Sequence, residues 1–417
     1  MREELVVGID IGSSENSVLI CRVSDADDFP RVIGYATSSS RGVKKGQIVD
    51  IVQATDSLQI ALDKAERMAG VGVKSARVGV GGPHIQSQNS SGVVAVTKAG
   101  IEIGEDDVNR AIEAAKAIST PASREIIAVI PREFIVDGQG SIKNPIGMSG
   151  VRLEVLTHII TASTTNLRNL ERCLDDLNVK TESLIYSGLA SANAVTSETE
   201  QELGIVVVDI GGGKTDIAIY VEGALSYSAS FGVGARHFTN DIAIGLRVGL
   251  DSAEKIKKYL SSLNDHSQEI INVRHLHLDD DIKEISFKEV YQGILRPRIE
   301  EMAEFIGKEI ANSGFLTSIP SGAVITGGGA LTLGILPIMK EKLTMPVRIG
   351  QPSQVTGIVD EVMTPLASGV VGLVQRPHQQ LSDFSKNAKK RMSVNMKFDI
   401  LENFGSKIGG VFKKLGI

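Results

Sequence analysis

Three glycine-containing segments carry residue types that could hold a nucleotide phosphate. Glycine lets the backbone approach a phosphate closely, hydroxyl and amide groups donate to its oxygens, and a carboxylate at a strand end can hold Mg²⁺ through water. The first two segments contain Asp10, Gly12, Ser13 and Ser14, and Asp209, Gly211, Gly212, Gly213, Lys214, Thr215 and Asp216. In the third, Gly327, Gly328 and Gly329 end an apolar strand before a helix, where bare backbone could lie against adenine and a helix N-terminus could face phosphate.

Each segment alone also fits an ordinary turn, because short glycine patterns are common between strands and before helices. The first two segments, however, have matching contexts. Residues 6–20 and 206–219 both show an apolar strand, an aspartate, a glycine turn and a second apolar strand. This long-range similarity indicates two α/β lobes that arose by duplication, with the three segments facing a cleft between them.

The elements around these segments support a mixed α/β fold. Residues 57–69 have helical apolar spacing, with Ser57 placed to cap the helix. Residues 83–161 alternate between strand and helix patterns, as in a compact α+β insertion within the first lobe. Later patterns predict a strand at 323–326 and helices near 253–262, 287–311, 331–342 and 365–374.

Composition excludes several classes of protein. The chain has 417 residues, of which 42% are hydrophobic and 23% charged, as in folded proteins of two or more domains. The two cysteines, Cys21 and Cys173, are too few for a disulfide framework or a cysteine-rich zinc site, which fits a reducing compartment. The N-terminus lacks a secretory signal pattern, and no apolar run reaches the length of about 18 residues that a membrane span needs. The net charge of −6 argues against nucleic acid as a partner.

The last 39 residues differ in charge from the rest, with eight lysine or arginine residues against three acidic ones. Residues 381–397 have the composition of a flexible linker. In residues 398–417 one helical stripe is apolar, with lysines at its margin, which is typical of a helix lying on an anionic lipid surface. The stripe contains Phe398, Leu401, Phe404, Ile408, Val411, Phe412 and Leu415, and the lysines are Lys407, Lys413 and Lys414. A helix packed on the body or in a partner's groove is the alternative.

The order of the three segments resembles that of the actin, Hsp70 and sugar-kinase ATPase superfamily. Within it the chain is most similar to the FtsA family of bacterial cell-division proteins. The similarity extends over nearly the whole chain, including GGPHIQSQNSSG, VDGQGSIKNPIGMSGVRLEV, SGLASANAV, FGVGARHFTNDIAIGL, AEKIKKYL and the apolar-basic tail.

The resemblance implies a two-lobed actin-like ATPase fold of duplicated RNase H-like domains, with an inserted subdomain and a C-terminal amphipathic helix. It also implies domain boundaries. Subdomain 1A would comprise 1–82, 162–200 and 355–380, subdomain 1C 83–161, subdomain 2A 201–230 and 321–354, subdomain 2B 231–320, the linker 381–397 and the membrane-targeting helix 398–417.

By the same resemblance, ATP and Mg²⁺ would occupy the cleft. Asp10 and Asp209 would organise Mg²⁺ and water, and Asp209 is the one candidate for a catalytic role. The turns at 12–14 and 211–216 would surround the phosphates, and Gly327 to Gly329 would face the adenosine. Glu254 and Lys257 are three apart on one helical face and match the family's ribose or adenine contacts, although a solvated ion pair is the ordinary interpretation.

Two positions depart from the family pattern. The first turn has Glu15 where a lysine is usual, and the second has Lys214 where threonine or serine is usual. A carboxylate near phosphate is unfavourable if it points inward. One hypothesis is that Lys214 supplies the missing positive charge from the opposite turn. The alternative is that both side chains are exposed.

The resemblance implies a protein that polymerises on the cytoplasmic face of the inner membrane at the division septum and anchors FtsZ filaments there. Its expected partners are the FtsZ C-terminal tail at subdomain 2B, further copies of itself, anionic lipids, and later divisome proteins at subdomain 1C. Arg296 and Arg298 are candidate contacts for the acidic-to-apolar FtsZ tail, although an exposed helix face explains them equally well, and Pro297 leaves the local geometry open.

The resemblance implies ATP binding, with at most a weak ATPase activity. Two alternatives on the same fold are a pilus or secretion assembly protein similar to PilM and a true enzyme such as a sugar kinase or an Hsp70-type ATPase. A kinase would need a base and sugar-binding polar groups in the cleft, and an Hsp70 would need a substrate-binding domain after residue 380.

Overall fold

The computed structural model describes residues 3–24, 28–96, 102–118, 120–263 and 268–375. The expected linker at 381–397 and the expected membrane helix at 398–417 lie outside these residues. Among the helices of the described ranges, none combines the length and the apolar character needed to cross a membrane.

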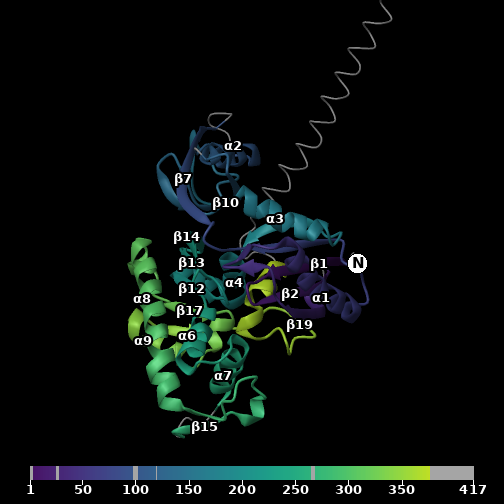
Figure 1. Cartoon of the computed structure of the whole chain (residues 1–417). Coiled ribbons are helices and arrows are strands. Elements are labelled where there is room, and N and C mark those ends of the chain that lie inside the picture. The colour runs from purple at the N-terminus through teal and green to yellow at the C-terminus, as the bar shows by residue number, and fades with distance from the viewer. Residues whose placement is uncertain (1–2, 25–27, 97–101, 119, 264–267, 376–417) are drawn as a thin grey trace, which may run out of the picture. The chain divides into compact units, whose positions relative to one another are not determined.

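Six strands form the sheet of the first lobe, in the order β11-β6-β1-β2-β3-β19 (Figure 1). The strands β1, β2 and β3 form an antiparallel meander, while β1 pairs in parallel with β6, and β6 with β11. Their bounds are β1 Glu4–Ile11, β2 Glu15–Val23, β3 Arg31–Ser39, β6 Ser75–Val80, β11 Lys180–Tyr186 and β19 Thr356–Gly357.

The sheet of the second lobe has the order β14-β13-β12-β17-β18. Here too the first three strands form an antiparallel meander, and β12 pairs in parallel with β17, and β17 with β18. Five strands therefore have the same order and directions in both lobes, which confirms the predicted duplication and the two-lobed α/β class. The bounds are β12 Ile205–Ile210, β13 Thr215–Val221, β14 Ala224–Phe231, β17 Ala323–Thr326 and β18 Val347–Ile349.

Two short helices of small residues lie between the sheets, α4 (Ser187–Val195) and α10 (Ser368–Val374). Every residue of α4 except Leu189 is buried, and the helix contacts β6 and β11 of one sheet and β12 and β13 of the other. A Cβ added to Gly372 would lie 1.7 Å from the carbonyl oxygen of Ala190, so the two helix backbones touch. Small side chains thus allow the lobes to approach each other closely.

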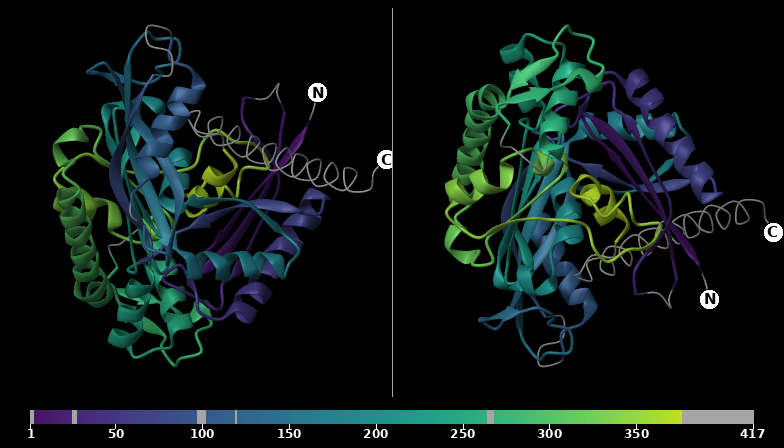
Figure 2. Two further views of the ribbon diagram at one scale, coloured as in Figure 1. Left: turned by 90° about the horizontal axis from the view of Figure 1, so that it is seen from above. Right: turned by 90° about the horizontal axis from the view of Figure 1, so that it is seen from below.

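The opposite face of the first sheet is covered by α1 (Ile51–Ala69), with α3 (Thr164–Asp175) beside it (Figure 2). The predicted cap at Ser57 is wrong. The helix begins six residues earlier, where Asp50 accepts a hydrogen bond from the Gln53 N–H (3.0 Å). Ser57 is buried inside the helix, where its hydroxyl donates to the Ala54 carbonyl. The helix extends beyond Ser57 because the apolar spacing continues back to Ala54.

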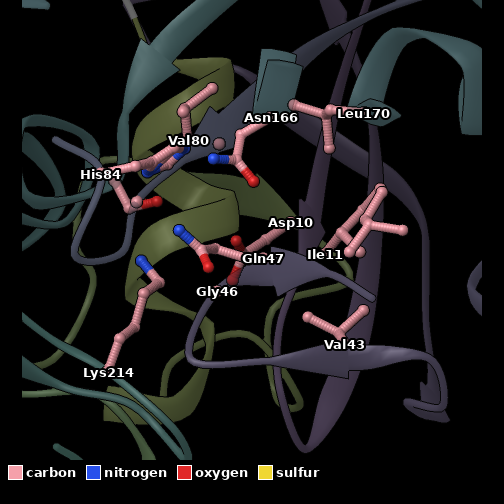
Figure 3. Close-up of a pocket in the computed structure, with 14 residues that line it drawn as sticks. Asp10, Ile11, Val43, Gly46, Gln47, Val80, His84, Asn166, Leu170 and Lys214 are labelled. Carbon is pink, nitrogen blue, oxygen red and sulfur yellow. The ribbon is translucent and has the colours of Figure 1, made fainter. Parts of the chain in front are cut away.

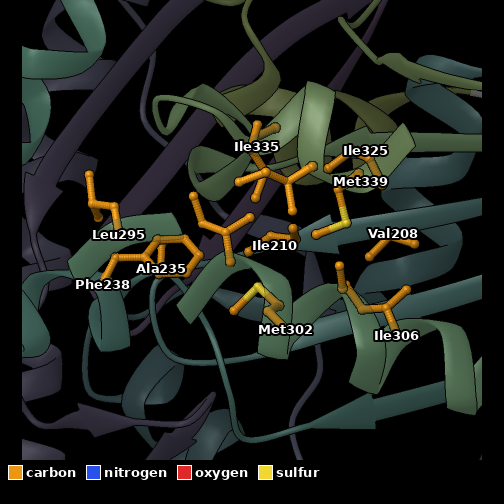
Figure 4. Close-up of a cluster of buried hydrophobic side chains, with 14 of the residues drawn as sticks. Val208, Ile210, Ala235, Phe238, Leu295, Met302, Ile306, Ile325, Ile335 and Met339 are labelled. Atoms are coloured by element: carbon orange, nitrogen blue, oxygen red, sulfur yellow. The ribbon is translucent and has the colours of Figure 1, made fainter. Parts of the chain in front are cut away.

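The second lobe has one hydrophobic core, in which helices pack against the five-stranded sheet (Figure 4). Ile210 and Ile325 of the sheet lie in the same cluster as Phe238, Met302 and Met339 from the helices. The segments expected as subdomains 2A and 2B therefore share this cluster. The helices are α6 Arg236–Leu246, α7 Leu250–Ser262, α8 Arg296–Asn312 and α9 Ile335–Leu343, and smaller elements are α5 Glu198–Leu203 and the hairpin β15 Ile270–Asn272 with β16 Glu284–Ser286.

Pro297 lies near the start of α8, immediately after the π-helical turn η2 (Glu289–Leu295). The Arg296 N–H donates to the carbonyl of Tyr291, five residues back. Proline lacks an N–H and crowds the preceding turn, which an α-helix interior tolerates poorly. The wider π-turn accommodates it at the junction of the two helical segments.

The insertion is a four-stranded antiparallel sheet in the order β7-β10-β8-β9 with α2 packed on it. Its elements are β7 Gln86–Ala95, α2 Glu105–Lys116, β8 Arg124–Val136, β9 Gln139–Ile142 and β10 Arg152–Ser163. Although the chain enters it from β6, its sheet also contacts β14 of the second lobe. The Ser87 hydroxyl donates to the Ser228 carbonyl (2.7 Å), and the Arg132 Nε to the Ser226 Oγ (2.9 Å).

A buried histidine lies in this contact. His158 on β10 is 1% exposed, with Nδ1 2.7 Å from Asn89 Oδ1 and Nε2 3.0 Å from Ser228 Oγ. The amide oxygen can only accept, so Nδ1 carries the proton and Nε2 accepts from the serine hydroxyl. Burial, with Arg132 nearby, lowers the pKa of His158 to about 3.

Acid should therefore weaken the contact between the insertion and β14. Because the pKa of His158 is lowered in the folded state, its contribution is complete above about pH 6.5 and is lost as the pH falls towards 3. At pH 5 we expect the His158 contribution to the free energy of unfolding to be about 2 kcal/mol smaller than at pH 7.5, which is the difference in pH dependence between the wild type and His158→Gln. Urea titrations at both pH values measure it. His158→Gln should show a shallower pH dependence, and equal dependence in both proteins would contradict this role.

Candidate functional site

The first two glycine segments form matching four-residue hairpin turns. In the first, the Gly12 N–H donates to the Glu15 carbonyl (3.1 Å), and in the second the Gly211 N–H donates to the Lys214 carbonyl (2.9 Å). Glu15 and Lys214 thus occupy equivalent positions in the two lobes. The two departures from the family pattern therefore lie at the same position of the duplicated turns, where one turn has an acidic residue and the other a basic one.

The two turns touch each other across the lobes. A Cβ on Gly212 would lie 2.1 Å from Ser14 Oγ, and one on Gly213 would lie 2.6 Å from Ser13 Oγ. Only glycine fits at these positions in this arrangement. Ser13 is also held from the other side, because its Oγ accepts a hydrogen bond from the Gly46 N–H (2.9 Å).

Lys214 lies among three carboxylates, of which that of Asp216 is buried and those of Asp10 and Asp209 are partly buried. Its ammonium group forms an ion pair with Asp216, and the two side chains are only 12% and 1% exposed. Burial opposes the charge on Lys214, but Asp216, Asp10 and Asp209 outweigh it and raise the lysine pKa above its usual value. Lys214 is therefore a charged, nearly buried cation, as the compensation hypothesis requires.

Asp10 and Asp209 are harder to ionise than ordinary aspartates. Burial raises the pKa of Asp10, and burial raises that of Asp209 to about 6, although Lys214 and the Ser191 hydroxyl, 2.5 Å from Asp209 Oδ2, act in the opposite direction. Three carboxylates around one ammonium group leave an excess of negative charge.

Such a site fits a divalent cation. In the described part of the chain, no group of three or more His, Cys, Asp or Glu side chains has a metal-holding arrangement. Mg²⁺ does not require one, because it keeps several waters and commonly uses one or two carboxylates together with phosphate oxygens. Asp10 and Asp209 are the residues that could hold it through water.

Two other turn residues differ from expectation. Thr215 is fully buried, and its hydroxyl donates to the Val233 carbonyl (2.8 Å) inside the second lobe. Alternate side chains of a strand point to opposite faces, so Thr215 turns away from the face that carries Lys214 and Asp216. Glu15 is partly buried, and burial raises its pKa although Lys258 on α7 and the Thr37 hydroxyl lower it. The alternative that Glu15 and Lys214 are both exposed is therefore excluded.

The third glycine segment lies against the second turn. Gly327 has φ 80°, and a Cβ there would lie 2.2 Å from Asp209 Oδ1. The expected helix at 331–342 does not follow directly. A 3₁₀ turn, η4 (Gly328–Leu331), comes first, and α9 begins at Ile335 after Gly334, which also has a positive φ. The structure thus brings all three segments together, without the α9 N-terminus directly after the glycines.

Glu254 and Lys257 on α7 form a half-buried network, in which Lys257 is buried and the Glu254 side chain is 37% exposed. The Lys257 ammonium group lies 2.6 Å from Glu254 Oε2 and 2.9 Å from Thr239 Oγ1, and its side chain is 10% exposed. The pair links α7 to α6 and orients one face of α7.

A pocket adjoins the turns on the first-lobe side (Figure 3). Its polar lining comprises Asp10, Gln47, His84, Asn166, Ser187 and Lys214. The sequence predicted the first and last of these. The other four come from the β4–β5 hairpin (Val43–Lys44 and Gln47–Ile48), the loop before β7, α3 and α4, which only the tertiary fold brings together. His84 and Ser187 lie in segments that carried the family resemblance, so resemblance was the available signal.

Arg296 and Arg298 already have acidic partners within the chain. Arg296 forms ion pairs with Glu300 (2.8 Å) and Glu341 (3.3 Å), while Arg298 pairs with Asp241 (2.5 Å) and Glu301. The side chain of Arg296 is 43% exposed and that of Arg298 is 31% exposed. An acidic peptide at this surface would have to replace these partners.

Comparison with known proteins identifies the family. A family model described as "Cell division protein FtsA" matches residues 206–372, and one described as "SHS2 domain inserted in FTSA" matches residues 82–161. A cell division protein FtsA of Pseudomonas aeruginosa is 36% identical over 98% of each chain, and one of Borreliella burgdorferi is 38% identical over 99% of each. The chain belongs to the FtsA family.

Solved structures agree with the FtsA fold. A structure of the PilM-PilN type IV pilus biogenesis complex has a TM-score of 0.64 at 13% identity, covering 90% of this chain and 98% of the other. MreB 5 of Spiroplasma citri bound to AMPPNP has a TM-score of 0.50 at 14% identity, covering 95% and 99%. These likenesses confirm the actin-like ATPase fold, while FtsA membership decides against the PilM, kinase and Hsp70 alternatives.

Proposed function

We propose that the chain is an ATP-binding actin-like protein of cell division that polymerises on the cytoplasmic face of the inner membrane and anchors FtsZ filaments at the septum. Membership of the FtsA family, over nearly the full length of its relatives, is the observation that carries this proposal. The contact between the two phosphate turns, with Gly327 beside Asp209, supports nucleotide binding between the lobes.

In this proposal ATP and Mg²⁺ bind where the three glycine segments meet. Ser13, Ser14 and the backbone at 211–213 would donate to phosphate oxygens, and Lys214 would supply a positive charge. Gly327 to Gly329 would face the adenosine, and Glu254 and Lys257 the ribose or adenine. Asp10 and Asp209 would hold Mg²⁺ through water, with Asp209 as a catalytic candidate. Lys214 forms an ion pair with Asp216, so Lys214 would have to exchange or share this partner to contact phosphate.

The partner surfaces follow the family. The FtsZ C-terminal tail would bind at residues 231–320, where Arg296 and Arg298 could exchange their internal carboxylates for acidic groups of the tail. Anionic lipids would bind the stripe in 398–417, later divisome proteins the insertion at 83–161, and further copies of the chain would extend a filament.

Co-sedimentation with vesicles containing phosphatidylglycerol, with and without ATP and FtsZ, tests the function. The full chain should pellet with the vesicles and carry FtsZ with it. A Phe404→Glu/Phe412→Glu variant, which places charge in the apolar stripe, should leave both proteins in the supernatant. Wild-type chain that stays in solution, or that pellets without FtsZ, would contradict the proposal.

Lys214 offers a sharper test of the nucleotide site. Lys214→Thr should weaken ATP binding at least 10-fold, because Asp10, Asp209 and Asp216 would then face the phosphates without a compensating cation. Lys214→Arg keeps the charge and should retain most of the affinity. Titration with a fluorescent ATP analogue measures both variants, and circular dichroism verifies that they are folded. Unchanged affinity in Lys214→Thr would rule out the compensation.

A further inference from the structure

The pocket beside the phosphate turns contains polar atoms that have no partner among the described residues. The Oγ of Ser187, a residue only 4% exposed, and the Nδ1 of His84 both line this pocket and are buried without a hydrogen bond. Beside it, Asp216 is 1% exposed, and its Oδ1 also lacks a partner. Leaving a buried polar atom unpaired costs about 1–3 kcal/mol. Their gathering in one place indicates a site built for a small polar occupant.

Glycines keep this space open. A Cβ on Gly79 would lie 3.0 Å from Asp10 Oδ1 and 3.3 Å from Ser187 Oγ, and one on Gly81 would lie 2.2 Å from the Lys214 Nζ. Positions 79 and 81 are two apart, so their missing side chains would point to the same side of the backbone, and glycine at both leaves the space between Asp10, Ser187 and Lys214 unfilled. His84 follows in the next turn, and its carbonyl is fixed by a hydrogen bond from the Arg124 guanidinium (2.9 Å).

The unpaired atoms indicate which occupant fits. Burial, with Arg124 and Lys214 nearby, lowers the pKa of His84 to about 4, so the imidazole is neutral at neutral pH and one of its nitrogens is an acceptor. Asp216 Oδ1 is also an acceptor when ionised. Phosphate oxygens carry few protons that could be donated to these two acceptors, whereas a water molecule can both donate and accept hydrogen bonds. The chemistry of this space therefore favours water over a phosphate group.

We propose that His84 is a positioning residue for the water that attacks the terminal phosphate of the bound nucleotide, with Ser187 as a second contact to that water. The inference rests on the proposed nucleotide site, whose Asp10 and Lys214 line the same pocket. In the step, the water oxygen bonds to the terminal phosphorus while the bond from that phosphorus to the bridging oxygen breaks. The diphosphate leaves with the electron pair, and the water proton ends on a phosphate oxygen. His84 orients the water by accepting a hydrogen bond.

The test separates binding from hydrolysis in the full chain on phosphatidylglycerol vesicles with Mg²⁺. His84→Ala should bind a fluorescent ATP analogue within about 3-fold of the wild type and release phosphate about 100-fold more slowly under single-turnover conditions. His84→Gln retains a hydrogen-bonding group and should recover about 10-fold of that loss. His275→Ala, at an exposed histidine in edge-to-face contact with Tyr259, is the matched control and should behave as the wild type.

The outcomes distinguish the two proposals. Wild-type chain that fails to bind ATP would overturn the proposed function itself. Wild-type chain that binds ATP without hydrolysing it would overturn this inference alone, as would a wild-type rate in His84→Ala. Loss of nucleotide affinity in His84→Ala would also overturn it, because His84 would then serve binding and not the chemical step. A rate in His84→Gln no higher than in His84→Ala would likewise exclude positioning by a hydrogen bond.

Discussion

Replacing Gly372 with alanine is expected to lower the free energy of unfolding by about 3 kcal/mol. The new methyl group would lie 1.7 Å from the carbonyl oxygen of Ala190 and 2.3 Å from its carbonyl carbon. Both atoms belong to the backbone of a helix that is buried between two sheets, so α4 and α10 must move apart. Because α10 packs on β1 while α4 contacts both sheets, the damage should spread beyond the two helices. Urea titration of the full chain, followed by circular dichroism, measures the loss.

Gly369 on the same helix is the matched control. A Cβ there would be 3.5 Å from its nearest neighbour, Asp10 Oδ2, which is ordinary van der Waals contact. Gly369→Ala should therefore leave the free energy of unfolding unchanged within about 1 kcal/mol, the helix propensity of alanine acting in its favour. Equal losses in the two variants would show that contact with Ala190 is not what requires glycine at position 372.

Replacing Gly327 with alanine is expected to weaken ATP binding about 100-fold. The added methyl group would lie 2.2 Å from Asp209 Oδ1 and 2.7 Å from the Ile210 carbonyl oxygen, and it would therefore displace a proposed metal-organising carboxylate. A misplacement of about 1 Å in such a site can cost two orders of magnitude. Affinity for a fluorescent ATP analogue, measured with Mg²⁺ present, reports the effect.

Backbone strain must be separated from this collision, because Gly327 has a positive φ. Gly314 has a similar φ of 79° and no heavy atom within 4 Å of the position of its Cβ, so it controls for the positive φ, whereas Gly327 also has ψ 172°, a combination that essentially only glycine adopts. Gly314→Ala should cost about 1–2 kcal/mol of stability through strain and leave ATP affinity unchanged. Similar losses of affinity in both variants would attribute the effect to strain and not to Asp209.

The duplication could be predicted from the sequence because its signal is local. Around Asp10 and Asp209, strand, aspartate, glycine turn and strand follow one another within about 15 residues, and pairing within a hairpin needs no distant partner. The direction of Thr215 could also have been inferred, since alternation along β13 places it opposite Lys214 and Asp216.

Other features depend on tertiary contacts. His84, Asn166 and Ser187 are far apart in the chain and meet only because β6, α3 and α4 converge on the pocket. Capping residues alone do not define the start of α1, because Asp50 and Ser57 are both of a suitable type; in the structure Asp50 is the cap and Ala54 is buried. The contact between His158 and Ser228 joins the insertion to the second lobe, although the chain enters and leaves the insertion through the first lobe.

The placement of α10 also determines when the first lobe can be completed during synthesis. Its strand β1 is among the first residues made, yet α10, which covers that strand, and β19, which pairs with β3, come after the whole second lobe. The second sheet, by contrast, is built from the continuous stretch 205–349. Ribosomes add roughly 5–20 residues per second. The face of the first lobe's sheet that α10 covers therefore stays exposed for roughly tens of seconds during synthesis. The second lobe is thus expected to fold first. The unfinished first lobe is then expected to bind chaperones during synthesis.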